Sequence, residues 1–188
     1  MKKIDSKGFS LIELILVIAI MGVLVGGSMN IIGYVGLGNV KKCANMINSY
    51  IGEVRSDALS QAEAPYLIVY KCSKGIYAYK TTLSGADTEI VNLDGSEGER
   101  LTGQSIDLTY TNEAGSQTMP DVSSESITVA DLKDKNNAIQ NKVIVIKFKK
   151  STGAISDSVN FCSNMKVKKN ARTYSINLIK DTGRYYIE

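Results

Sequence analysis

The sequence predicts an α+β fold in which one long N-terminal α-helix packs on an antiparallel β-sheet or β-sandwich. Three patterns support this fold class. The chain is apolar from Phe9 to Val25, apolar positions then repeat at intervals of three and four as far as Ala58, and the period changes to two after Pro65. The first two patterns are typical of helices and the third of half-buried strands.

The first expected element is an apolar helix over residues 9–36, which would span a membrane or form a filament core. Glu13 is the only charged residue between Phe9 and Val25, and the apolar run continues through interspersed glycines to Ile32. This length is sufficient for a helix to cross a hydrocarbon core. The basic residues before it favour a cytoplasmic N-terminus, and they are Lys2, Lys3 and Lys7.

Glu13 makes this helix unusual, because a carboxylate in a membrane costs about 2.5–3.5 kcal/mol. No Lys or Arg occurs between Phe9 and Val40, so the helix offers the carboxylate no cationic side chain. Gly8 precedes the apolar core, whereas a secretory signal is cleaved after its core. Cleavage after Gly8 would keep the helix on the mature protein and create a free amine at Phe9. The alternative is an anchor helix whose Glu13 is protonated or reaches the membrane interface.

The residues Gly8-Phe9-Ser10-Leu11-Ile12-Glu13 resemble the class III leader junction of type IV pilins and pseudopilins. The resemblance implies that residues 1–8 are a leader peptide, that a membrane prepilin peptidase cleaves between Gly8 and Phe9, and that the Phe9 amine is N-methylated. It also implies that Glu13 faces the Phe9 amine of a neighbouring subunit during assembly. The implied partners are other pilin subunits, the peptidase and the pilus assembly machinery. The implied location is the cytoplasmic (inner) membrane, as a single-pass prepilin, and then an extracellular filament.

The second half of the helix, residues 37–64, is expected to be amphipathic. Glycines at 33, 36 and 38 soften its start, because each costs a helix up to about 1 kcal/mol relative to alanine. Beyond them, apolar residues at 40, 43/44, 47, 50/51, 54 and 58 form one face. The helix should end near Gln61–Ala64, because the residue before Pro65 is disfavoured in a helical conformation.

Residues 65–188 are expected to form a β-rich globular domain. A hairpin is predicted from Tyr66–Lys71 and Gly75–Lys80, and the strongest strand signal lies within Lys142–Lys150. A turn at Asp181-Thr182-Gly183 should form the last hairpin. The other expected strands lie at 88–93, 105–111, 126–130, 154–155, 172–179 and 184–187, separated by loops rich in Gly, Ser, Asp and Asn.

A second resemblance concerns the end of the helix. Residues 53–61 are similar to the helix end of GspH/FimT-like minor pilins, in which the helix also runs into an apolar strand and the chain ends on a Thr-Gly hairpin. The mid-helix proline usual in major type IVa pilins is missing, and Asn30 stands near its place. The resemblance therefore favours a minor pilin. The alternatives are a DNA-binding minor pilin for DNA uptake, a type II secretion pseudopilin, and a membrane-anchored adhesin that keeps its leader.

We do not expect an enzyme. Histidine is absent, which removes histidine-based triads and imidazole proton shuttles. The phosphate-binding glycine motifs are also missing. We interpret Lys150-Ser151-Thr152-Gly153 as a hairpin turn rather than a phosphate loop. The sequence accordingly predicts no catalytic residue and no cofactor.

Charge is distributed unevenly along the chain. Residues 1–80 carry nine basic and five acidic side chains, residues 81–141 carry three and eleven, and residues 142–188 carry ten and three. The basic end could neutralise the phosphates of DNA, or it could contact the acidic middle of a neighbouring subunit. The candidate DNA-binding residues in its densest part are Lys166, Lys168, Lys169 and Arg172.

The segment from Asn92 to Glu99 is the best candidate for a metal site. It offers three carboxylates around two glycines, an oxygen-rich arrangement of the kind that calcium prefers. The spacing does not match an EF-hand, so a solvated acidic turn is the favoured interpretation. The candidate ligands are Asp94, Glu97 and Glu99.

The chain has three cysteines, Cys43, Cys72 and Cys162, so at least one stays unpaired within a single chain. A Cys72–Cys162 bridge would join two predicted strands, and a Cys43–Cys72 bridge would link the helix to the sheet. Three free buried thiols fit the sequence equally well, because cysteine often serves as a small apolar residue.

Overall fold

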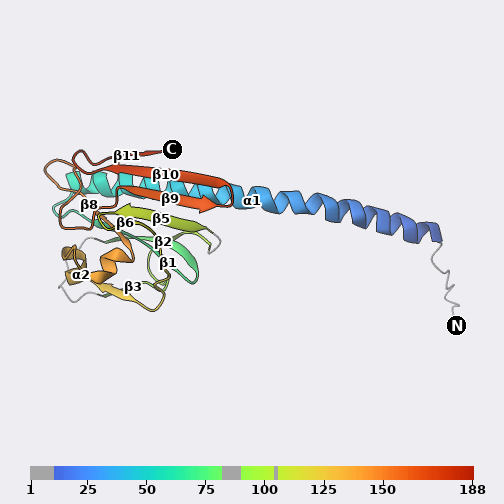
Figure 1. The fold of residues 1–188 in the computed structure, drawn as a ribbon, viewed down its shortest axis with the longest axis horizontal. Coiled ribbons are helices and arrows are strands. Elements are labelled where there is room, and N and C mark those ends of the chain that lie inside the picture. Colours follow the sequence, from blue (N-terminus) through green and yellow to red (C-terminus); the bar gives the residue numbers. More distant parts are fainter. Residues whose placement is uncertain (1–10, 82–89, 104–105) are drawn as a thin grey trace, which may run out of the picture. The chain divides into compact units, whose positions relative to one another are not determined.

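The computed structural model describes residues 11–81, 90–103 and 106–188, except for the side chains of residues 24–37 and of Val129. The predicted leader, residues 1–8, and the predicted cleavage site lie outside these ranges. Within them the chain is α+β, with a helix followed by antiparallel sheets, as the sequence predicts (Figure 1). The chain divides into two compact units, residues 1–37 and 38–188.

Helix α1, Leu11–Ser60, contributes to both units and is continuous through the glycines at 33, 36 and 38. In the first unit, every side chain described, from Leu11 to Val23, is exposed. Within the described residues, no helix is both long enough and apolar enough to span a membrane.

In the second unit, α1 buries the predicted amphipathic face. Seven of its side chains lie in the core, and they repeat at intervals of three and four. The exposed positions between them are polar or charged, such as Lys41, Lys42, Asn45 and Glu53. The buried residues are Val40, Cys43, Ala44, Ile47, Ile51, Val54 and Ala58. The helix ends at Ser60, slightly before the predicted range.

A four-stranded antiparallel sheet has the order β4-β2-β1-β8. Its strands are β1 (Tyr66–Cys72), β2 (Gly75–Thr81), β4 (Glu99–Thr102) and β8 (Ile144–Lys147). The predicted hairpin is confirmed, since Tyr66 pairs with Thr81 and Cys72 with Gly75. Gly75 has φ +141°, and a Cβ atom there would lie 2.0 Å from the Thr102 carbonyl oxygen, so the tight turn depends on glycine.

A five-stranded antiparallel sheet has the order β11-β10-β9-β5-β6. One face of it joins the core through alternating apolar residues, among them Leu108, Met165, Val167 and Ile176. The strands are β5 (Asp107–Asn112), β6 (Gly115–Thr118), β9 (Asn164–Lys169), β10 (Arg172–Ile179) and β11 (Arg184–Ile187). The last two strands coincide with the predicted ranges. A third, two-stranded sheet pairs β3 (Ile90–Asn92) with β7 (Ser126–Thr128).

Five elements were not expected from the sequence. Strands β4, β6 and β9 were read as loops or as a basic cluster, and helices α2 (Val129–Lys133) and η1 (Ala138–Asn141) were missed. The strand expected at 126–130 stops at Thr128 because Thr128 and Asp131 form a reciprocal capping box that starts α2. Residues 154–155 form only an isolated bridge, between Ile155 and Phe148.

Candidate functional site: the N-terminal segment of helix α1

The first turns of α1 present a carboxylate at the start of an apolar helix. Glu13 lies in the first turn and its side chain is exposed. Among the described residues 11–23, Glu13 is the one charged side chain, and its neighbours along the helix are apolar. Gly8 and Phe9, the predicted processing residues, lie outside the described residues.

The rest of this segment exposes an unbroken apolar surface. Leu11 is 77% exposed and Val23 is 76% exposed, and eight further large apolar side chains between them are at least 45% exposed. Six side chains at helical spacing form one shallow apolar hollow along the helix: Ile12, Ile15, Leu16, Ala19, Ile20 and Val23. Burying a leucine or isoleucine side chain contributes about 1.5–3 kcal/mol, so this surface is a strong driving force for association with lipid or with other apolar helices.

The N-terminal residues match a known family. Residues 4–29 match the family model described as the prokaryotic N-terminal methylation motif. This match supports a type IV pilin-like protein that is processed by a prepilin peptidase and assembled with other pilins. It covers Glu13 and the whole exposed apolar surface of residues 11–23. No curated protein and no solved structure matches the chain.

The predicted DNA-binding residues come together on the β9–β10 hairpin. Lys169 pairs with Arg172 across the turn, and Asn170 occupies the turn with φ 54°, a conformation that asparagine tolerates well. Lys166 and Lys168 alternate with the buried residues Met165 and Val167, so both point to the exposed face of the sheet.

An acidic residue partly offsets this basic cluster. Asp107 on β5 stands opposite Lys168 in the strand register, and its carboxylate lies 3.9 Å from the Lys71 ammonium. Thr109 stands opposite Lys166. At the turn of the hairpin, the basic residues Lys169 and Arg172 stand opposite each other.

The candidate calcium ligands do not assemble into a site. The Asp94 carboxylate accepts hydrogen bonds from the backbone and hydroxyl of Ser96, which hold the pKa of Asp94 below its usual value. Glu97 accepts from the Asn92 amide and Glu99 from the Tyr50 hydroxyl on α1. The three carboxylates thus have separate partners, and no metal-binding group of three or more is present among the described residues.

The two glycines of this segment have a backbone role instead. Gly95 and Gly98 have φ +80° and +87°, and a Cβ atom at Gly98 would lie 2.6 Å from the Ala78 carbonyl oxygen. Glycine is needed there for the close approach to β2.

The cysteines are three buried free thiols, and neither of the considered bridges is formed. Burial raises the pKa of Cys43 and of Cys162 to about 12. A thiol with such a pKa is almost entirely protonated at neutral pH, and it is the thiolate that reacts. The cysteines therefore act here as apolar core residues.

Two groups of charged residues were missed by sequence reasoning. On α1, Glu53 and Asp57 both accept from the Lys80 ammonium of β2, with the Asp57 contact at 3.1 Å. Their spacing of four residues is the available sequence signal, because it places both carboxylates on one side of the helix. The second group is a lysine-rich pocket next to β8, whose members come from three separate segments.

Proposed function

We propose that this protein is a structural subunit, a minor pilin, of a type IV pilus or a related filament. The observation that carries the proposal is the match of residues 4–29 to the N-terminal methylation motif. The exposed apolar surface of residues 11–23 supports it, because such a surface is stable in water only when something covers it.

The proposed mechanism has a membrane stage and a filament stage. The apolar helix anchors the prepilin in the membrane, and cleavage between Gly8 and Phe9 leaves that helix on the mature chain. The new Phe9 amine, once methylated, still carries a positive charge. In the filament, Glu13 of one subunit pairs with this amine on a neighbour, and apolar helices replace lipid around each other. Pairing lowers the free-energy cost of moving each charge out of water.

The second compact unit has the role of a folded body carried on that helix, without enzymatic activity. Its core combines the amphipathic part of α1 with strands from the four- and five-stranded sheets. The exposed face of β9 and β10 is polar, and lysine, threonine and asparagine predominate on it. Such a face suits contact with water or with other subunits.

A direct test compares charge variants of the assembly segment. Glu13→Gln keeps the size of the side chain and removes its charge, and Glu188→Gln makes the same change at the exposed C-terminus. We expect Glu13→Gln to reduce incorporation into surface filaments at least tenfold by immunoblot of sheared filaments, while membrane levels stay unchanged. Glu188→Gln should assemble normally. Normal incorporation of Glu13→Gln would refute the pairing role.

DNA binding during uptake is a second candidate function, favoured by the basic β9–β10 hairpin. If Lys169 and Arg172 contact phosphates, affinity for DNA should fall as salt rises, with a slope of about −0.9 per phosphate on logarithmic axes. The double variant Lys169→Gln/Arg172→Gln should reduce the magnitude of that slope by about two. Lys135→Gln should leave the slope unchanged. Binding that is insensitive to salt, or no binding, would exclude this function.

The genes beside this one and the presence of surface filaments distinguish a pilus subunit from a type II secretion pseudopilin.

A further inference from the structure

A pocket of about 450 Å³ lies where the segment after α1 passes beside β8 and α2. Four of its lining residues are lysines, and they come from two parts of the chain. Lys133 ends α2, Lys147 ends β8, and Lys149 and Lys150 follow β8. The remaining lining residues are Glu63, Ala64, Tyr66, Phe148 and Ser156.

The fold forces the lysines together. Lys147 and Lys149 are two residues apart on an extended segment, so their side chains leave it on the same side. Between them, Phe148 points into the core and is 1% exposed. The bridge between Phe148 and Ile155 holds this segment in place, and so does the 2.7 Å hydrogen bond from the Lys149 amide to the Ala154 carbonyl.

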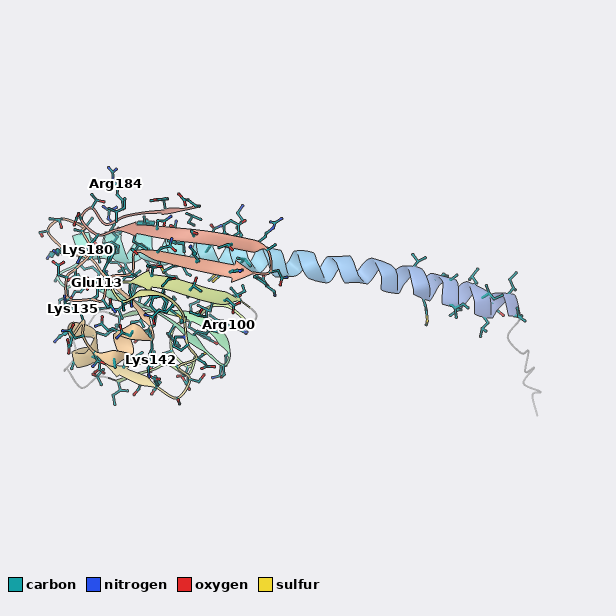
Figure 2. The ribbon with its side chains drawn as sticks, viewed as in Figure 1. Arg100, Glu113, Lys135, Lys142, Lys180 and Arg184 are labelled. Carbon is teal, nitrogen blue, oxygen red and sulfur yellow. The ribbon has the colours of Figure 1, made fainter. Side chains whose placement is uncertain are left out.

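The lysines of the pocket differ in how far their charges are balanced. The Lys149 ammonium lies 2.6 Å from the Asp157 carboxylate, which also binds Lys180 at 3.2 Å. Figure 2 shows Lys180 near Glu113, a second carboxylate at 3.8 Å from it. The charge of Lys149 is therefore balanced within the protein.

Lys147 and Lys150 have only neutral partners among the described residues. The Lys147 ammonium donates to the Tyr66 hydroxyl at 2.8 Å and lies 4.1 Å from the centre of the Tyr66 ring. The Lys150 ammonium donates to the Ala62 carbonyl at 3.4 Å. Both lysines line the same pocket, so an anion bound there would be attracted by two ammonium groups.

Two features act against an anion. The C-terminal end of α1 is close by, and its last carbonyl groups carry a partial negative charge. Glu63, which is exposed, adds a carboxylate to the lining. Lys150 partly offsets the negative carbonyl groups at the end of α1, because its ammonium donates to the Ala62 carbonyl. Lys147 is therefore the ammonium best placed to bind a ligand.

We propose that this pocket is a binding site for a small phosphate-bearing ligand, with Lys147 as its main anchor and Lys150 as its second. A phosphate group has enough acceptor oxygens to receive hydrogen bonds from both ammonium groups, and lysine binds phosphate as a point charge. The pocket is larger than an inorganic phosphate ion and lies within the range usual for small-molecule sites. The shared chemistry fits free phosphate or a phosphate monoester.

The test uses the full-length protein in a non-ionic detergent and isothermal titration calorimetry at constant ionic strength. Inorganic phosphate, glycerol 3-phosphate and malonate are the three probes. We expect saturable one-to-one binding of at least one phosphate probe, more tightly than malonate. Tighter binding of glycerol 3-phosphate than of phosphate would identify a monoester as the ligand, and the reverse would identify free phosphate. No saturable binding of either phosphate probe, or malonate binding as tightly, would overturn the proposal.

Matched variants localise the site. Lys147→Gln should weaken phosphate binding roughly tenfold or more, because hydrogen bonds to charged groups are among the stronger ones. Lys150→Gln should weaken it as well and leaves the Tyr66 contact intact. Lys135→Gln removes the same charge from an exposed position outside the pocket and should bind as the wild type does. Equal losses in Lys135→Gln and in both pocket variants would mean that only net charge matters, which would overturn the site.

Discussion

Replacing Ile47 by alanine tests how the amphipathic part of α1 holds the second unit together. Ile47 is fully buried in the middle of the helical stripe. The change removes three carbon groups, each worth about 0.8 kcal/mol of burial. The cavity left behind raises the usual cost of such a change to about 2–5 kcal/mol. Alanine is the better helix former and returns a few tenths of a kcal/mol. We expect a net loss of about 3 kcal/mol in the free energy of unfolding.

The assay is urea denaturation of the full-length protein in a non-ionic detergent, followed by near-ultraviolet circular dichroism of the tyrosines. Asn45→Ala is the matched control, because Asn45 is exposed on the same helix, two residues away. It should change the free energy of unfolding by no more than about 0.5 kcal/mol. A loss below about 1 kcal/mol for Ile47→Ala would show that the stripe does not form the core contact described here.

Two further predictions concern the second unit. Gly183→Ala should cost more than about 1 kcal/mol of unfolding free energy in the same assay, because φ is +61° and the new Cβ would lie 1.8 Å from the Gly153 carbonyl oxygen. Gly38→Ala has open space around it and should instead stabilise the protein by up to about 1 kcal/mol. Equal effects of the two changes would contradict this geometry. Hydrogen bonds from Lys149 and Lys180 hold the pKa of Asp157 below its usual value, so its contribution to stability is complete above the unfolded pKa of about 3.9 and is lost as the pH falls through the folded pKa. Asp157→Asn should therefore be less stable than the wild type at pH 7 and equal to it at the acid end, and a difference that grows on acidification would contradict this sign.

The elements predicted correctly are those in which one residue period runs without interruption. The buried stripe of α1, the β1–β2 hairpin and the final β10–β11 hairpin all follow from local periodicity and turn residues. Local patterns suffice there because each element buries one continuous face.

The missed elements depend on contacts that are distant in the sequence. Strand β4 has few apolar residues and exists because it pairs with the edge of β2, twenty or more residues away. Strand β9 does alternate, through Met165 and Val167, but its lysines gave it the appearance of a charged loop. A capping box of Thr128 and Asp131 ended a predicted strand that propensity alone would have continued.

In the candidate sites too, local sequence features could be predicted and features that depend on contacts distant in the sequence could not. The match of residues 4–29 to the methylation motif agrees with the resemblance seen at residues 8–13, because that motif is local, with its order and polarity fixed within a few residues. The calcium candidate stays a prediction: its three carboxylates are close in sequence, but in the structure each accepts a hydrogen bond from a different partner. The lysine pocket could not be predicted, since Lys133, Lys147 and Glu63 meet only in the folded chain.

The central claim is that the chain is processed as a filament subunit, and intact-mass analysis of the mature protein tests it most directly. Protein purified from the membrane, or from sheared filaments, should begin at Phe9 and carry one additional methyl group on that amine. A mature chain that still begins at Met1 would contradict the account, because Glu13 would then have no Phe9 amine to meet.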